Sequence, residues 1–147
     1  MELSKSDSQI LNILLENSRL SFRQIAKKAG CSVATVLNHV KRLEKDGAIK
    51  GYSALLDYTS LGYEFEALIE MRVSKGKLFE VEKKIASNPN VCAVFDVTGH
   101  FDAVVLARFK SRKGLDAFLK KIQALDFVER TETKMILNTI KEAPLKV

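Results

Sequence analysis

The hydrophobic residues of this 147-residue chain recur with two different periods, and the change between them divides the chain. As far as Gly47 they follow the spacing of helices that bury one face. From Glu64 onward, polar and apolar residues alternate in several segments, as in half-buried strands. We therefore predict a helical domain over residues 1–50, a strand and linker over 51–62, and a second domain over 63–147.

Polar and glycine residues mark the ends of three helices in the first domain. Ser6 and Ser21 each precede a glutamine by three positions, which is the capping-box spacing at a helix start. Gly30 suits the left-handed end of the second helix, Ser32 is a good N-cap for the third, and Gly47 can stop it. Two helices joined by a tight glycine-containing turn are typical of a helix-turn-helix. A generic three-helix bundle that makes protein contacts would show the same pattern, so both interpretations stay open.

The third helix has one apolar stripe and one free face. Val33, Val36, Val40 and Leu43 recur at helical spacing and predict the packed side. Residues 1–50 hold nine basic and five acidic side chains, which favours a polyanionic partner such as DNA. On the free side, asparagine suits adenine, and threonine suits a thymine methyl or a phosphate.

We assign base contacts in the major groove to Thr35, Asn38, His39 and Arg42, and phosphate contacts mainly to Arg23, Lys27, Lys28 and Lys41. Ser32 joins this set at the start of the helix, and Lys45 extends the basic line along it. The predicted partner of the first domain is double-stranded DNA.

The second domain reads as strand, helix, strand, strand, helix, strand. The predicted strands are 64–73, 91–98, 102–109 and 128–137, and the predicted helices are 78–88 and 115–122. With right-handed crossovers, this order gives an α+β fold: a ferredoxin-like βαββαβ domain with both helices on one face of an antiparallel sheet. Leu68 among Glu64, Glu66, Glu70 and Arg72 indicates a mixed surface on the other face, and we predict an obligate homodimer.

Several other classes of protein find little support in the sequence. No apolar run is long enough for a membrane span and the N-terminus lacks the features of a signal peptide, so we expect a cytoplasmic protein without a membrane partner. Cys31 and Cys92 belong to no metal-binding or disulfide pattern. His100 with Asp102 could be imagined as an enzyme site, but a polar hairpin turn is favoured. We therefore expect no enzyme activity, no metal and no cofactor.

The residues resemble a known family. The runs RQIAKKAG, SVATV and HVKRLEKDGAIKGYSALLD, followed by VTGHFD and VERTETKMIL, are similar to the Lrp/AsnC transcription regulators of bacteria and archaea. The resemblance covers nearly the whole chain. It implies a winged-helix-like N-terminal domain that binds DNA, a ferredoxin-like domain that senses a small molecule, dimers that often assemble into octamers, and amino acids bound between dimers.

Three positions depart from the family pattern. Leu37 stands where a polar or basic residue is frequent, His39 where an arginine is frequent, and Val33 where a proline is often found. The first two predict base contacts that differ from those of the family pattern. The proline would only preset an angle that a helix already has.

The effector is predicted at the hairpin between the second and third strands. The resemblance implies an amino-acid pocket there, and Gly99 and Asp102 match its motif. Asp102 could pair an ammonium group, and loop amides could meet a carboxylate. The predicted effector-binding residues are Thr98, Gly99, His100, Asp102, Thr131 and Thr133. The alternative is that Asp102 only caps the turn.

The overall prediction is a sequence-specific DNA-binding transcription regulator that is modulated by a small molecule. The alternative function is an amino-acid-binding or assembly protein whose N-terminal bundle makes protein contacts.

Overall fold

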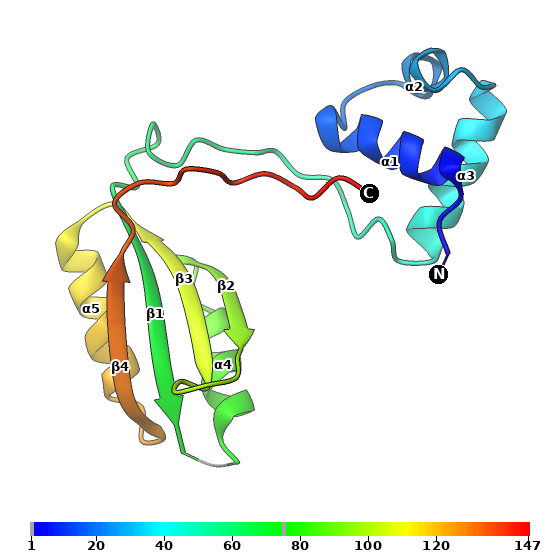
Figure 1. The fold of residues 1–147 in the computed structure, drawn as a ribbon. Helices are drawn as coiled ribbons and strands as arrows, with labels where there is room; N and C mark the ends of the chain where they lie inside the picture. Colours follow the sequence, from blue (N-terminus) through cyan, green and yellow to red (C-terminus); the bar gives the residue numbers. More distant parts are fainter. Residues whose placement is uncertain (1, 75) are drawn as a thin grey trace. The chain divides into compact units, whose positions relative to one another are not determined.

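The computed structural model describes residues 2–74 and 76–147, which divide into two compact units (Figure 1). One unit contains residues up to Leu55 together with Lys141–Val147, and the other contains Leu56–Ile140. Three helices form the first unit: α1 (Lys5–Glu16), α2 (Phe22–Ala29) and α3 (Val33–Lys45). The second unit contains β1 (Phe65–Val73), α4 (Leu78–Ala86), β2 (Val91–Asp96), β3 (Ala103–Phe109), α5 (Arg112–Gln123) and β4 (Val128–Met135).

Helix α1 starts two residues earlier than the sequence suggests. Ser4, not Ser6, is the N-cap, and it forms a full capping box with Asp7. The prediction of a capping box at Ser6 is therefore wrong. The carboxylate of Asp7 accepts the Ser4 backbone N–H at 2.9 Å, a charge-assisted bond that a glutamine at position 9 cannot match. Ser21 and Ser32 cap α2 and α3 as predicted.

The core of the first unit is small and lies between its three helices. Ile10, Ile25, Val36, Val40 and Leu43 are each at most 1% exposed. These residues confirm the predicted stripe of α3 except at its first position. Val33 is 45% exposed: it is the first residue of α3 and does not belong to the hydrophobic core of the unit.

The segment 51–62 differs from its prediction. It contains no strand, because its extended residues have no neighbouring strand with which to form a ladder, and 58–62 form turns. The end of the chain also differs from the predicted division, since Lys141–Val147 pack with the first unit rather than with the sheet.

The second unit has the predicted ferredoxin-like topology. Its four strands are antiparallel in the order β2-β3-β1-β4, and α4 and α5 cover one face (Figure 1). The core lies between helices and sheet, where alternate residues of β1, beginning with Ala67, Ile69 and Met71, are fully buried. The other alternate residues of β1 lie on the open face of the sheet.

Candidate nucleic-acid interface and effector loop

The connection between α2 and α3 fixes the start of the third helix. Gly30 has φ +66°, a left-handed conformation that L side chains rarely adopt, and its N–H donates to the carbonyl of Ala26. After Cys31, the hydroxyl of Ser32 accepts the N–H of Thr35 at 3.0 Å. The Ser32 and Thr35 hydroxyl oxygens also lie 2.8 Å apart. These bonds hold both predicted DNA-binding hydroxyls at the N-terminal end of α3, where the helix dipole favours a phosphate.

The outward face of α3 consists of small, amide and basic side chains. Ala34, Asn38, Lys41 and Lys45 are exposed and follow one another at helical spacing. Within the described ranges, the amide of Asn38 has no recorded hydrogen bond and remains available for a base edge. The sequence assignment overlooked Ala34, although its position one turn before Asn38 would have identified it. A methyl side chain there leaves room for a groove wall to approach the helix closely.

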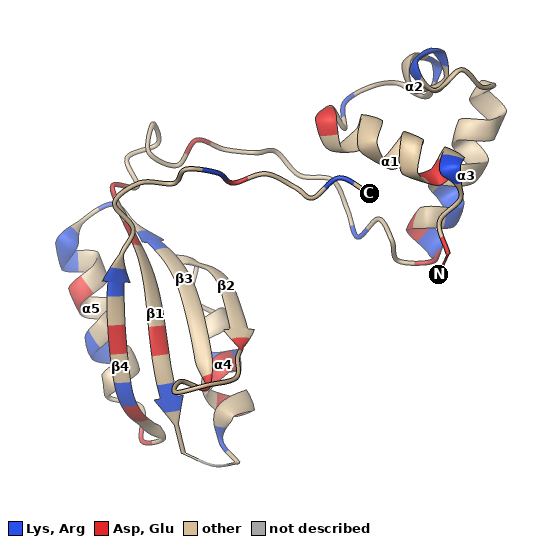
Figure 2. Cartoon of the chain, in the orientation of Figure 1, with Lys and Arg blue, Asp and Glu red and all other residues tan. Residues whose placement is uncertain are grey.

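Three cations of α2 add a second positive surface. Arg23, Lys27 and Lys28 are all exposed, and among the described residues no ion pair is recorded for them. Figure 2 shows this basic segment on α2 together with the basic residues of α3. The cations that the sequence assigns to phosphates are therefore presented to solvent on two adjacent helices of one unit.

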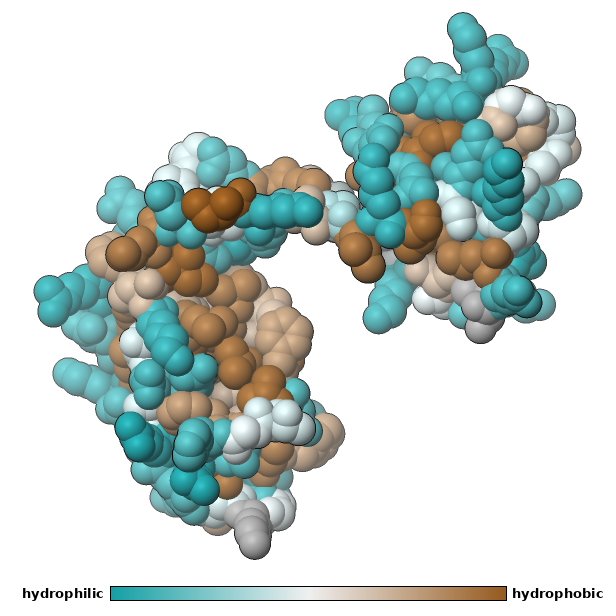
Figure 3. Space-filling view, viewed as in Figure 1, coloured by the Kyte–Doolittle hydropathy of each residue, from teal (hydrophilic) through white to brown (hydrophobic). Residues whose placement is uncertain are grey.

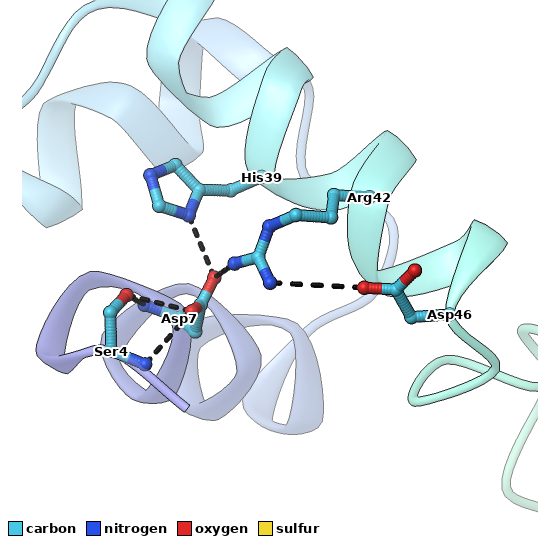
Figure 4. A network of polar contacts seen from close by, with 5 residues as sticks. All are labelled: Ser4, Asp7, His39, Arg42 and Asp46. Atoms are coloured by element: carbon cyan, nitrogen blue, oxygen red, sulfur yellow. Dashed lines mark hydrogen bonds and ion pairs between the residues drawn. The ribbon is translucent and has the colours of Figure 1, made fainter. Parts of the chain in front are cut away.

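His39 and Arg42 do not belong to that outward face. Both side chains turn toward α1, where they meet the carboxylate of Asp7 (Figure 4). The His39 Nδ1 atom lies 2.7 Å from Asp7 Oδ1, and Arg42 Nη2 donates to the same oxygen. The structure thus places these two residues, predicted as base contacts, in a contact between helices.

Asp7 is the centre of this network. Its side chain is only 1% exposed and also accepts the hydroxyl of Ser4 at 2.7 Å. Burial raises the pKa of a carboxyl, but hydrogen bonds from His39, Ser4 and Arg42 outweigh burial and hold the pKa of Asp7 well below its usual range. Asp7 is therefore a charged anchor that fixes α3 on α1. One signal in the sequence could have identified Asp7: it is an acidic residue in the first turn of a helix.

The predicted effector loop is exposed and begins where β2 ends. Thr98, Gly99 and His100 are all exposed, and Gly99 has φ +122°, which L side chains rarely adopt. Asp102 Oδ2 accepts the backbone N–H of Val73 at 2.8 Å, and the Asp102 N–H donates to the carbonyl of Met71. Asp102 therefore does cap the turn against β1, with one carboxylate oxygen.

Thr131 and Thr133 lie on another strand and on the helix side of the sheet. They pair with Met71 and Ile69, two buried residues of β1, and the Thr131 hydroxyl accepts a hydrogen bond from Gln123 of α5. Strand β1 separates them from β3, which the loop precedes. The structure does not bring these two threonines together with the loop in one pocket of a single chain.

The open face of the sheet combines apolar residues with ion pairs. Leu68 pairs with Leu106 across β1 and β3, and Phe95 of β2, paired with Val104, is 54% exposed. Figure 3 shows this hydrophobic area on the exposed face of the sheet. Its charged residues are largely paired within the chain: Glu66 with Arg108 at 2.6 Å, and Glu70 with Lys134 at 2.5 Å. The strand glutamates therefore neutralise neighbouring cations.

A helix-turn-helix with unpaired outward cations, followed by a ferredoxin-like domain, defines a class: transcription regulators that join a DNA-binding domain to a ligand-binding domain. Sequence comparison agrees with this class at both ends of the chain. The Lrp/AsnC ligand binding domain matches residues 66–145, and a winged helix-turn-helix DNA-binding domain matches residues 3–50. The chain belongs to the Lrp/AsnC family, whose members are transcription regulators and not enzymes.

Individual relatives cover almost the full length. An uncharacterized HTH-type transcriptional regulator of Pyrococcus furiosus is 42% identical over 142 residues, 97% of this chain and 96% of that protein. The HTH-type transcriptional regulator FL11 of Pyrococcus horikoshii is 34% identical over 140 residues, 95% of this chain and 93% of that protein.

Solved structures extend the comparison to the fold. The AsnC structure of E. coli superimposes with a TM-score of 0.92 at 25% identity and covers 100% of both chains. A transcriptional regulator of Neisseria meningitidis in complex with L-Met has a TM-score of 0.89 at 26% identity, and the match covers 97% of this chain and 94% of that one.

The described part of the chain contains no helix that is both long and apolar enough to cross a membrane.

Proposed function

We propose that this regulator binds specific DNA sequences through α3, with Thr35 and Asn38 at the base edges. The observation that carries the proposal is the exposed amide of Asn38, flanked by Ala34 and Lys41 on the outward face of the helix. An asparagine amide matches the paired donor and acceptor of adenine in the major groove. Arg23, Lys27, Lys28, Lys41 and Lys45 supply phosphate contacts.

The proposal gives His39 and Arg42 a different role from the one that the sequence suggested. Their contacts with Asp7 hold the recognition helix at a fixed position on α1. In this proposal they position the reading side chains instead of reading bases themselves.

The second domain, in this proposal, makes the homodimer through the open face of its sheet and binds an amino acid near the 98–102 loop. Support for a dimer comes from the Leu68, Leu106 and Phe95 surface, which has an apolar core and paired charges. The family domain is a ligand-binding domain, and one structural relative is a complex with L-Met. Asp102 has a second carboxylate oxygen, Oδ1, with which an ammonium group can pair. Since Thr131 and Thr133 lie elsewhere in the single chain, their contact with the same ligand requires a second copy.

The decisive experiment is the affinity of the purified protein for DNA as a function of salt. Selected operator fragments and random duplexes would be compared by fluorescence anisotropy between about 50 and 200 mM salt. Binding to both should fall steeply with salt, by about tenfold or more, because phosphate contacts release counterions. Operator binding should stay stronger throughout. Equal affinity for all sequences would contradict sequence-specific reading, and salt-independent or absent binding would leave an assembly protein as the better description.

A further inference from the structure

The C-terminal segment 141–147 contacts α1 through the backbone of Val147 and the side chain of Lys146. The side-chain amide of Asn12 makes two hydrogen bonds with Val147: the Val147 N–H donates to Asn12 Oδ1 at 3.0 Å, and Asn12 Nδ2 donates to the main-chain oxygen of Val147 at 2.5 Å. One helical turn further along α1, Glu16 Oε1 lies 3.3 Å from Lys146 Nζ. This paired amide contact fixes the position of Val147 on α1.

An apolar cavity lies beside these bonds. Its volume is about 500 Å³, and Pro144 of the C-terminal segment lines it. The opposite walls come from α1 and from residues 48–55, through Leu11, Leu14, Leu15, Ile49, Tyr52 and Leu55. Hydrogen bonds, an ion pair and an apolar contact thus converge on one short segment of the chain.

The wall formed by 48–55 is attached directly to the recognition helix. The Ile49 N–H donates to the carbonyl of Leu43 at 3.1 Å. The Tyr52 hydroxyl donates to Glu44 at 2.9 Å, and burial together with the Glu44 carboxylate raises the pKa of Tyr52 to about 12. Anything that packs against this wall therefore acts on the C-terminal half of α3.

The segment covers the cavity only loosely. Leu55 is 87% exposed and Leu145 is 86% exposed, so little apolar area is buried. An isolated heptapeptide at micromolar concentration would therefore remain mostly unbound. Within one chain the effective concentration of a tethered segment reaches the millimolar range, which makes even a weak contact populated. The occupant that fits is thus the chain's own C-terminal segment.

We propose that the face of α1 around Asn12, together with residues 48–55, is a docking site for residues 141–147 of the same chain, and that docking braces α3. Five residues, 136–140, connect this segment to the end of β4 in the ligand-binding domain. A change at β4 is thereby transmitted to the recognition helix through the docked segment. The transmission to DNA rests on the proposed function, whereas the docking itself does not.

Amide hydrogen exchange of the full chain tests the docking. We compare the wild type with a chain that lacks residues 141–147 and with Asn12→Ala. Exchange in residues 48–55 should rise about threefold to tenfold in both variants, because two hydrogen bonds and one apolar contact are lost. Exchange in β1 and β3 should not change. The matched control is Asn138→Ala, since Asn138 is exposed in the same C-terminal stretch and makes no hydrogen bond recorded for the described residues.

A peptide restores the contact if docking is real. The sequence KEAPLKV, added at about millimolar concentration to the shortened chain, should return the exchange of 48–55 toward the wild-type rate, and the reversed sequence should not. Unchanged exchange in both variants would overturn the proposal. Protection that disappears on dilution of the intact protein would also overturn it, because the segment would then come from a second copy.

Affinity for operator DNA is a separate readout. The shortened chain should bind operator DNA about threefold to tenfold more weakly than the Asn138→Ala control. If the wild type binds no DNA, the proposed function fails, but the exchange result remains interpretable. If DNA binding is intact in all variants while exchange rises, docking occurs but does not brace α3, which overturns the second half of the proposal.

Discussion

The imidazole of His39 on α3 meets the carboxylate of Asp7 on α1 at 2.7 Å. Only 1% of the Asp7 side chain is exposed, compared with 24% for His39, so the acidic partner is the buried one. If His39 and Arg42 are removed, Asp7 is left as a buried anion without these partners. If Asp7 is removed, His39 and Arg42 lose the acceptor of their hydrogen bonds. This pair therefore links the stability of the domain to the position of its recognition helix.

Replacing Asp7 with asparagine should destabilise the first unit by about 1–3 kcal/mol, because charge-assisted bonds from His39 and Arg42 are lost. The change would be measured by denaturant unfolding, with exchange of the Val36 and Val40 amides as the local probe. Asp46→Asn is the matched control. Asp46 lies 3.9 Å from Arg42 and is 40% exposed, so its loss should cost less than about 0.5 kcal/mol. Equal effects of the two variants would show that Asp7 is not a buried anchor.

The same carboxylate predicts how stability depends on pH. Because the folded-state pKa of Asp7 is lowered, the unfolded chain takes up this proton first as the pH falls. The contribution of Asp7 is therefore present above pH about 4, near the ordinary pKa of an aspartate, and decreases progressively below it. Unfolding curves between pH 6 and 3 should show a steeper loss of stability for wild type than for Asp7→Asn. Parallel curves would contradict this assignment.

Asn38→Ala should cost about 1–3 kcal/mol of operator affinity and relax the preference at one base pair. Lys28→Ala should weaken all sequences alike and reduce the salt dependence by about one unit of slope. Binding to the operator and to a set of single-base variants, measured at several salt concentrations, separates the two effects. If the Asn38 variant lost equal affinity for operator and random DNA, its proposed role in reading bases would be incorrect.

If two copies associate through the open sheet face, as we propose, Leu106→Lys should leave the protein monomeric at micromolar concentration while the wild type is a dimer. Leu106 faces Leu68 in the centre of the open sheet face, and a charge there would be buried without a partner. Sedimentation would report the size. The control is Leu137→Lys, since Leu137 lies beyond the end of β4 and is 93% exposed. A Leu106 variant that stayed dimeric would exclude this face as the interface.

If the chain binds an amino acid at the 98–102 loop, as we propose, Asp102→Asn should abolish that binding while it preserves the loop. Asparagine retains an oxygen that can accept the Val73 N–H, but it removes the charge that would pair with an ammonium group. Calorimetry against a panel of amino acids would first identify a binder and then measure the variant. Asp116→Asn is a control on the exposed side of α5. Retained affinity in the Asp102 variant would place the ligand elsewhere.

Much of the fold follows from local signals in the sequence. The alternation in FEALIEMRV predicts β1 and its buried face, and Gly30 with Ser32 predicts the turn between α2 and α3. These features depend on residues close together in the chain, where spacing and backbone preference decide the outcome.

Contacts between distant residues could not be predicted in this way. His39 and Asp7 are 32 positions apart, and a helical wheel of α3 cannot show which flank meets α1. The return of Val147 to Asn12 spans 135 positions and leaves no periodic signal. The sequence therefore indicated which residues could bind DNA, but not which of them the packing of α1 would occupy.

The pairing of charges separates the two surfaces that this regulator presents. On the open sheet face, Glu66 and Glu70 neutralise Arg108 and Lys134 inside one chain, so the dimer that we propose forms without the release of many counterions. On α2, Arg23, Lys27 and Lys28 still hold mobile counterions that must leave when a phosphate arrives. In the proposed function, a rise in potassium concentration therefore releases the protein from DNA without separating the proposed dimer, and the dimer rebinds when the ion concentration falls.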